Sequence, residues 1–176
     1  MNIYFDIETE GFDFKKDKII SIQVQEINNK GQAIGDLNIY KEWIESEEII
    51  VKKVYKELIE KDNWNWVLVG TNLIFDLTFL WEKFKKYNLP LKQTLSEYLY
   101  NKPLIDLKYT LIMINGLNFK GASLDQMTNK KQSGKEVPNW YKNKDYDKII
   151  GYITQETEAF LEFFEKCNKH LSQLKK

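Results

Sequence analysis

The first hydrophobic run of the chain ends in two acidic residues. Residues 3–5 (Ile-Tyr-Phe) are typical of a buried strand, and Asp6-Ile7-Glu8 follows them directly. Because strand side chains alternate, we expect Asp6 and Glu8 to point to the same face of a sheet. Two such carboxylates repel each other unless a cation lies between them, and carboxylate oxygens suit Mg²⁺ or Mn²⁺. The alternative interpretation is an ordinary solvated strand end.

The composition excludes several other kinds of reactive site. The one cysteine, Cys167, cannot form an internal disulfide or a Cys-rich zinc site. The one histidine, His170, lies near the end of a Lys-rich predicted helix, where we expect it to be solvated. A Ser-His-Asp triad or a His-based metal cage is therefore not expected, and the sequence has no phosphate-binding glycine motif. Carboxylates remain as the obvious reactive groups.

The charge balance gives no independent sign of a nucleic-acid partner. Basic and acidic residues number 26 each, so the net charge is zero. All the basic residues are lysines, so any phosphate must be held by ammonium groups rather than by an arginine fork. No signal peptide or membrane-length apolar run is present, which predicts a soluble cytoplasmic protein without a membrane partner.

The hydrophobic pattern predicts strands first, and then helices alternating with strands. We expect strands at 2–6, 18–27, 36–43, 66–70 and 104–105. We expect helices after Ser46 and at 76–87, 107–114, 123–126 and 147–174, with a polar Lys-rich loop at 129–145. The chain is thus expected to be α/β, with a mixed sheet between helices on both faces and one domain over 1–176.

Two further segments place acidic residues in settings that suit a shared site. Asp76 follows a short apolar strand and the turn Gly70-Thr71-Asn72, although an Asp there could equally be a helix N-cap. In the last helix, Tyr152 and Glu156 are four residues apart and so share a face. Glu156 also fills a gap in the apolar stripe, so we expect it to face the sheet and to need a partner there.

Taken together, Asp6-Ile7-Glu8-Thr9, Asn72-x-x-Phe75-Asp76 and Tyr152-x-x-x-Glu156 resemble the three motifs of the DnaQ-like 3′-to-5′ exonuclease superfamily. The tyrosine makes the chain similar to the DEDDy subclass, because the other subclass has a histidine where this chain has Gly151. The segments 102–107 and 123–125 also resemble that superfamily. One departure is Glu156, since the third motif normally ends in the shorter Asp.

This resemblance implies a ribonuclease H-like fold, in which the first three strands are antiparallel and the later ones parallel. It also implies two Mg²⁺ or Mn²⁺ ions held by Asp6, Glu8, Asp76 and Glu156, with Asp6 bridging both. Tyr152 would orient the attacking water. The expected reaction is the release of nucleoside 5′-monophosphates from single-stranded DNA or RNA 3′ ends.

The resemblance also implies substrate contacts, and these are the residues Thr9, Phe12, Asn72 and Phe75. Phe12 would lie against the terminal bases, the alternative being ordinary core packing. Lysines interleaved with Trp140 and Tyr141 could follow a single-strand backbone, or could simply be solvated. These lysines are Lys130, Lys131, Lys135, Lys142 and Lys144.

Two other functions stay open at this point. Glu156 and the zero net charge are compatible with a weakly active or inactive nucleic-acid-binding module on the same fold. The absence of a polymerase region is compatible with a subunit that acts in trans within a polymerase or repair complex.

Overall fold

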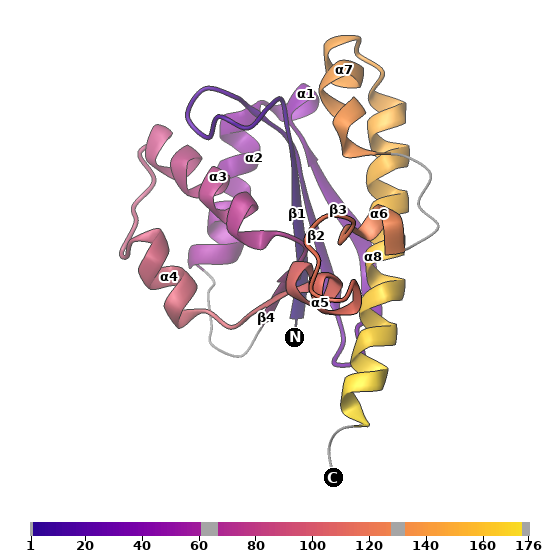
Figure 1. The fold of residues 1–176 in the computed structure, drawn as a ribbon. Coiled ribbons are helices and arrows are strands. Elements are labelled where there is room, and N and C mark those ends of the chain that lie inside the picture. Colours follow the sequence, from indigo (N-terminus) through magenta and orange to yellow (C-terminus); the bar gives the residue numbers. More distant parts are fainter. Residues whose placement is uncertain (1, 61–66, 128–132, 174–176) are drawn as a thin grey trace.

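Five strands form one mixed sheet with helices on both of its faces (Figure 1). This computed structural model describes residues 2–60, 67–127 and 133–173. The strand order is β3-β2-β1-β4-β5, with antiparallel pairing from β1 to β3 and parallel pairing from β1 through β4 to β5. The predicted architecture, antiparallel in its first three strands and then parallel, is therefore confirmed.

The elements follow one another from strands to helices along the chain. The strands are β1 (Asn2–Thr9), β2 (Ile19–Ile27), β3 (Ala33–Lys41), β4 (Val67–Gly70) and β5 (Leu104–Asp106). The helices are α1 (Glu42–Glu45), α2 (Glu47–Tyr55), α3 (Leu73–Lys86), α4 (Leu95–Asn101), α5 (Leu107–Ile114), α6 (Leu124–Met127), α7 (Val137–Lys142) and α8 (Tyr146–Ser172). A π-helical turn (Lys56–Glu60) extends α2, and a 3-10 turn (Gly134–Glu136) precedes α7. In the part of the chain described, no helix is both long and apolar enough to cross a membrane.

The central strand β1 divides its side chains between two hydrophobic cores. Ile3, Phe5 and Ile7 are buried against the core beneath α2 and α3. Tyr4 points the other way and packs on Phe160 of α8, with ring centroids 4.6 Å apart. Asp6 and Glu8 continue the face of Tyr4, because strand side chains alternate. The acidic residues therefore lie on the side of the sheet that α8 covers.

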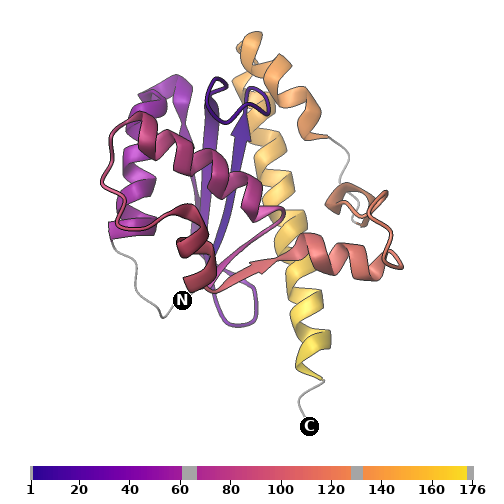
Figure 2. The ribbon, with the colours of Figure 1, turned by 60° about the vertical axis from the view of Figure 1, so that its left-hand side comes forward.

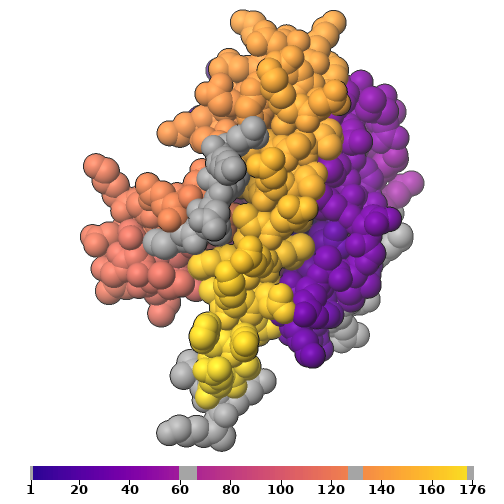
Figure 3. Space-filling model, turned by 90° about the vertical axis from the view of Figure 1, so that its right-hand side faces the viewer, coloured from indigo at the N-terminus to yellow at the C-terminus, as the bar shows by residue number. Residues whose placement is uncertain are grey.

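Helix α8 crosses that face of the sheet, while α2, α3 and α4 lie on the other (Figure 2). Its buried stripe repeats every three or four residues, as expected for one face of an amphipathic helix. The stripe consists of Ile149, Tyr152, Ile153, Thr157, Phe160 and Phe164. In Figure 3, α8 lies on the surface between the β-strands on one side and the α5–α6 region on the other.

The junction between β4 and α3 is built from close backbone approaches. Gly70 ends β4 where a Cβ atom would lie 2.6 Å from the Phe5 carbonyl oxygen, so a larger residue does not fit. Asn72 takes the left-handed conformation, with φ of 62°. The Asp106 carboxylate then accepts the backbone N–H groups of Asn72 (2.8 Å) and Leu73 (3.0 Å). Helix α3 thus begins at Leu73, so the interpretation of Asp76 as an N-cap is wrong.

The predicted polar loop over residues 129–145 is also wrong in part. Residues 134–136 form a 3-10 turn and Val137–Lys142 form α7, with Pro138 in the first turn of that helix. Proline suits this position because its missing N–H would have no partner there. The Lys130 and Lys131 predictions lie outside the described residues.

A buried ion network joins α2 to α3 at the end of the sheet. The Glu47 carboxylate is 4% exposed, and it accepts hydrogen bonds from the Ile19 backbone (2.9 Å) and from Lys86 (2.7 Å). The ammonium of Lys83 is fully buried, 3.4 Å from Glu47, and also donates to the Asp17 carbonyl. Burial raises the pKa of Glu47, but the hydrogen bonds from Lys86, Tyr87 and the Ile19 backbone, together with the charge of Lys83, outweigh it and hold that pKa below its usual value.

We expect Glu47→Gln to destabilise the fold by about 3 kcal/mol, because it leaves the buried Lys83 ammonium without its carboxylate. Urea unfolding followed by circular dichroism measures this change. Because the folded pKa of Glu47 is lowered, its contribution is present above the unfolded pKa and lost as the pH falls through the folded value. The two proteins should therefore converge in stability as the pH falls from neutral through that folded pKa.

The matched control for this prediction is Glu48→Gln on the same helix. Glu48 is half exposed in an i, i+4 pair with Lys52, so its loss should cost less than about 0.5 kcal/mol. Equal effects of the two substitutions at pH 7 would contradict the assigned role of the buried network.

Candidate active site

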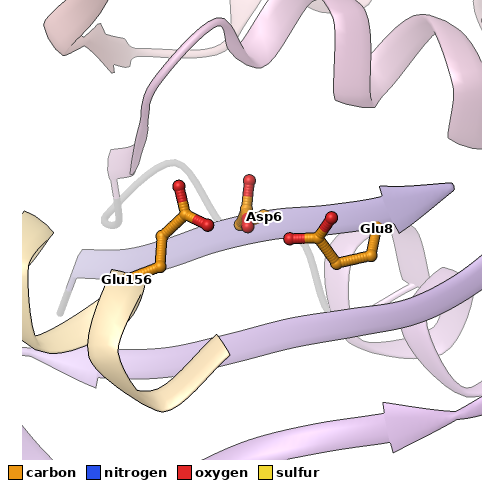
Figure 4. Close-up of side chains that lie close together, drawn as sticks. All are labelled: Asp6, Glu8 and Glu156. Carbon is orange, nitrogen blue, oxygen red and sulfur yellow. The ribbon is translucent and has the colours of Figure 1, made fainter. Parts of the chain in front are cut away.

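Three carboxylates from opposite ends of the sequence meet beside β1. One oxygen each from Asp6, Glu8 and Glu156 lies within 4.8 Å of the other two. Glu156 reaches from α8 toward Asp6, with Glu8 beyond it on the same strand (Figure 4). Glu8 is 9% exposed, while Asp6 and Glu156 are half-buried. The expectation that Glu156 faces the sheet is confirmed.

These groups meet because the spacing of side chains along β1 matches the spacing along α8. Alternate residues of a strand are about 6.6 Å apart, and residues four apart on a helix are about 6.0 Å apart. Tyr4 packs on Phe160, so Asp6 comes opposite Glu156, one helical turn earlier. The next turn brings Tyr152 toward Glu8.

The Tyr152 hydroxyl is held among the negative charges of the cluster. Burial raises the pKa of Tyr152 far above its usual value, and the charges of Glu8 and Glu156 and a hydrogen bond with Glu156 add to the effect. Gly134 lies against this hydroxyl, since a Cβ atom there would come within 2.7 Å of it. The phenol is therefore protonated at neutral pH and closely covered.

Asp76 is the fourth predicted acid. Among the described residues, the cluster consists of Asp6, Glu8 and Glu156 and does not include it. It is 4% exposed, and its Oδ2 atom has no hydrogen-bond partner among the described residues. Burial raises the pKa of Asp76, as do the charges of Asp6, Asp106 and Glu156. A buried carboxylate oxygen without a donor is costly, and a cation would remove that cost.

These observations fit a divalent-cation site. Oxygens bound to one Mg²⁺ lie at most about 4.2 Å apart, so small side-chain rotations would bring the three clustered carboxylates into range. The partnerless oxygen of Asp76 is a further ligand of the same hard type. The donor set is entirely oxygen, which suits Mg²⁺ or Mn²⁺ and not zinc bound by sulfur or nitrogen.

A cavity of about 320 Å³ opens beside the cluster. Its lining comes from the start of α3, the start of α5, the α5–α6 connection and α8. The lining residues are Thr71, Asn72, Lys108, Phe119, Ala122, Ser123, Leu124, Asp125, Tyr152 and Glu156. Asn72, predicted as a substrate contact, thus shares a cavity with two predicted catalytic residues.

The remaining predicted contacts surround the loop between β1 and β2. Phe12 is 84% exposed, which rules out the alternative of core packing, and its ring lies 6.1 Å from that of Phe75 in an edge contact. The Thr9 hydroxyl donates to the Gly11 carbonyl (2.7 Å) within the same loop. Asp17 accepts the Asp13 N–H (2.9 Å) and so closes the turn that presents Phe12.

Three residues with a place in this site were not predicted from the sequence. Asp106 holds the start of α3. Lys108 lines the cavity, and Gly134 lies against the Tyr152 hydroxyl. The position of Asp106 at the end of a predicted strand was a usable signal, because strand ends gather at one edge of a parallel sheet. Nothing comparable marked Lys108 among so many lysines.

Comparison with known proteins gives one family and one group of similar structures. The model of the RNase_H superfamily matches residues 3–169. E. coli exonuclease I in complex with a dT13 oligonucleotide has a TM-score of 0.69 at 11% identity, over 98% of this chain and 42% of that one. Apo exonuclease I gives a TM-score of 0.52 at 13% identity, over 68% and 32%. At these identities the likeness concerns the fold alone, and this chain spans well under half of exonuclease I.

A third structure, product-bound exonuclease I, gives a TM-score of 0.51 at 12% identity, over 68% of this chain and 33% of that one. A search of curated protein sequences finds no match.

We expect Mn²⁺ to raise the melting temperature of the wild-type chain relative to EDTA, because a bound cation relieves carboxylate repulsion. Asp6→Asn should abolish most of that increase. In EDTA the same variant should melt no lower than wild type, since it removes one of the repelling charges. Differential scanning calorimetry in both buffers measures these changes.

The control for this prediction is Glu158→Gln, an exposed acid on the same helix as Glu156. Its response to Mn²⁺ should match that of the wild type. An unchanged response in Asp6→Asn would mean that the cation binds elsewhere.

Proposed function

Since the chain belongs to the RNase H superfamily, we propose that it is a metal-dependent nuclease that removes nucleotides from the 3′ ends of single strands. The observation that carries this proposal is the convergence of Asp6, Glu8 and Glu156 beside a cavity that Tyr152 also lines. The likeness in fold to exonuclease I, seen in complex with dT13, supports a single-stranded substrate. We further propose that residues 1–176 act as one catalytic unit.

The carboxylates would serve as the ligands of two divalent ions. Asp6, Glu8 and Glu156 would hold one, and Asp76 would help to hold the other with its partnerless oxygen. Divalent ions bound here would supply an activated water and neutralise charge on the phosphate that is cleaved. By holding these ions, the four side chains would bring the phosphodiester and that water together.

Tyr152 would act as a hydrogen-bond donor and not as a base. A phenol has an ordinary pKa of about 10 and burial raises that of Tyr152, so at neutral pH the hydroxyl has a proton to donate to the attacking water or to a phosphate oxygen. Its hydrogen bond with Glu156 and the contact of Gly134 restrict where that hydroxyl can point. The expected products are nucleoside 5′-monophosphates.

Phe12 and Phe75 would contact the bases of the strand next to the cleaved bond. Phe12 is almost fully exposed at the tip of a turn braced by Asp13 and Asp17. An exposed ring held in a fixed turn is suited to stacking, and stacking on a base tolerates any sequence. The same contact serves DNA and RNA, so we propose single strands of either kind as substrates.

An inactive binding module is a weaker proposal for this chain. Its motive is the substitution of Glu for Asp at the end of the third motif. The longer Glu156 side chain nevertheless reaches within 4.8 Å of Asp6 and Glu8. This reach supports a working site, which is the proposal we favour.

We expect the wild-type chain with Mg²⁺ or Mn²⁺ to shorten a 5′-labelled 20-nucleotide single strand one nucleotide at a time. A 3′-labelled strand should release its label first, as a mononucleotide. Asp6→Ala should lower the rate by about a thousandfold, because it removes a ligand at the centre of the cluster. Denaturing gel electrophoresis of timed samples measures both rates.

Glu158→Ala serves as the control, since this exposed acid lies on α8 outside the cluster. Its rate should equal that of the wild type. Internal cuts in a circular single strand, or equal rates in Asp6→Ala and wild type, would rule out the proposed reaction.

We expect Glu156→Asp to reduce the rate by about tenfold or more. The shorter side chain withdraws its oxygens by one methylene from a cluster built around Glu, and metal ligands tolerate small displacements only. Rates measured over a range of Mn²⁺ concentrations should show a weaker apparent metal affinity. A large gain in rate from a nearly silent parent would instead favour the inactive module.

A further inference from the structure

We propose that Lys108 binds a phosphate of the substrate strand and that Asn72 positions it for this purpose. The inference rests on the proposed function for its class of ligand, a single-stranded nucleic acid. It assigns Asn72 a role different from the direct substrate contact that its motif implies.

Lys108 is the one cation among the described residues that line the cavity, which it shares with Glu156 and Tyr152. Its ammonium donates to the Asn72 side-chain oxygen at 2.7 Å and lies 5.6 Å from the centre of the Phe119 ring. No carboxylate of the described residues lies within ion-pair distance of this ammonium. A half-buried ammonium thus has an amide and a ring as neighbours, and neither supplies a negative charge.

Hydrogen-bonding capacity leads to the same conclusion. An ammonium group has three N–H donors, and Asn72 accepts only one of them. A partly desolvated cation gains most from an anion that can take the remaining donors. A phosphate of a strand that ends beside Tyr152 is such an anion, and it would meet a positive charge in a site otherwise made of carboxylates.

The backbone around Lys108 fixes where its side chain starts. Asp106 accepts the backbone N–H groups of Asn72, Leu73 and Lys108 itself, the last at 2.9 Å. One carboxylate therefore ties the start of α3 to the start of α5. Because the Asn72 backbone is held in this way, its side chain starts from a fixed point, and its oxygen accepts the Lys108 ammonium there.

The test measures binding of a 5′-fluorescein-labelled dT12 strand by fluorescence anisotropy in EDTA, over a range of NaCl concentrations. We expect Lys108→Met to weaken binding by about tenfold at low salt and to reduce the salt slope by about one. Lys108→Arg should restore the slope, because it restores the charge. Asn72→Gly keeps the left-handed backbone and removes the amide, so it should weaken binding while it retains most of the slope.

The control is Lys92→Met, an exposed lysine that is not among the lining residues of the cavity, and its binding should equal that of the wild type. Circular dichroism melting of each variant identifies any loss of fold. An unchanged affinity and slope in Lys108→Met, the same loss in Lys92→Met, or no binding by the wild type would overturn the inference. Since the assay contains no divalent metal, a chain that binds through Lys108 but cleaves nothing would sustain the inference and refute the proposed nuclease.

Discussion

Repulsion among carboxylates is the constraint around which this structure is organised. Asp6, Glu8 and Glu156 are held together although each would be more stable in water. The force that holds them is hydrophobic, since Tyr4 packs against Phe160 one step further along the same strand and helix. Packing in the core thus offsets the repulsion between the charges. A bound cation would reduce that repulsion and so raise the stability of the fold.

The sheet and the convergence of the acids could be predicted from local sequence because they depend on simple periodicities. Alternation placed Asp6 and Glu8 on one face, and the gap in the apolar stripe of the last helix placed Glu156 toward the sheet. Their roles in catalysis stay predictions. Both patterns could be recognised in the sequence because each records which side chains of the strand or helix face the core.

Contacts between segments distant in sequence were beyond such patterns. The start of α3 depends on a carboxylate from β5, so the helix begins at Leu73, before the predicted start at 76, and Asp76 lies inside it. The helix at 137–142 was missed because it is only six residues long and lies in a Lys-rich stretch, and only Pro138 marked its first turn. The position of Lys108 depends on Asn72, 36 residues earlier, and no local spacing encodes that pair.

The buried Lys83 links two parts of the molecule that the proposed reaction needs in register. Its ammonium holds the Asp17 carbonyl in the loop that presents Phe12, while its backbone belongs to α3, which carries Phe75 and Asp76. The loop of the exposed ring and the helix of the buried acid are therefore joined by one buried side chain. For a strand lying across both, the spacing between the stacked base and the cleaved bond would be set by the fold, not by the sequence of the strand.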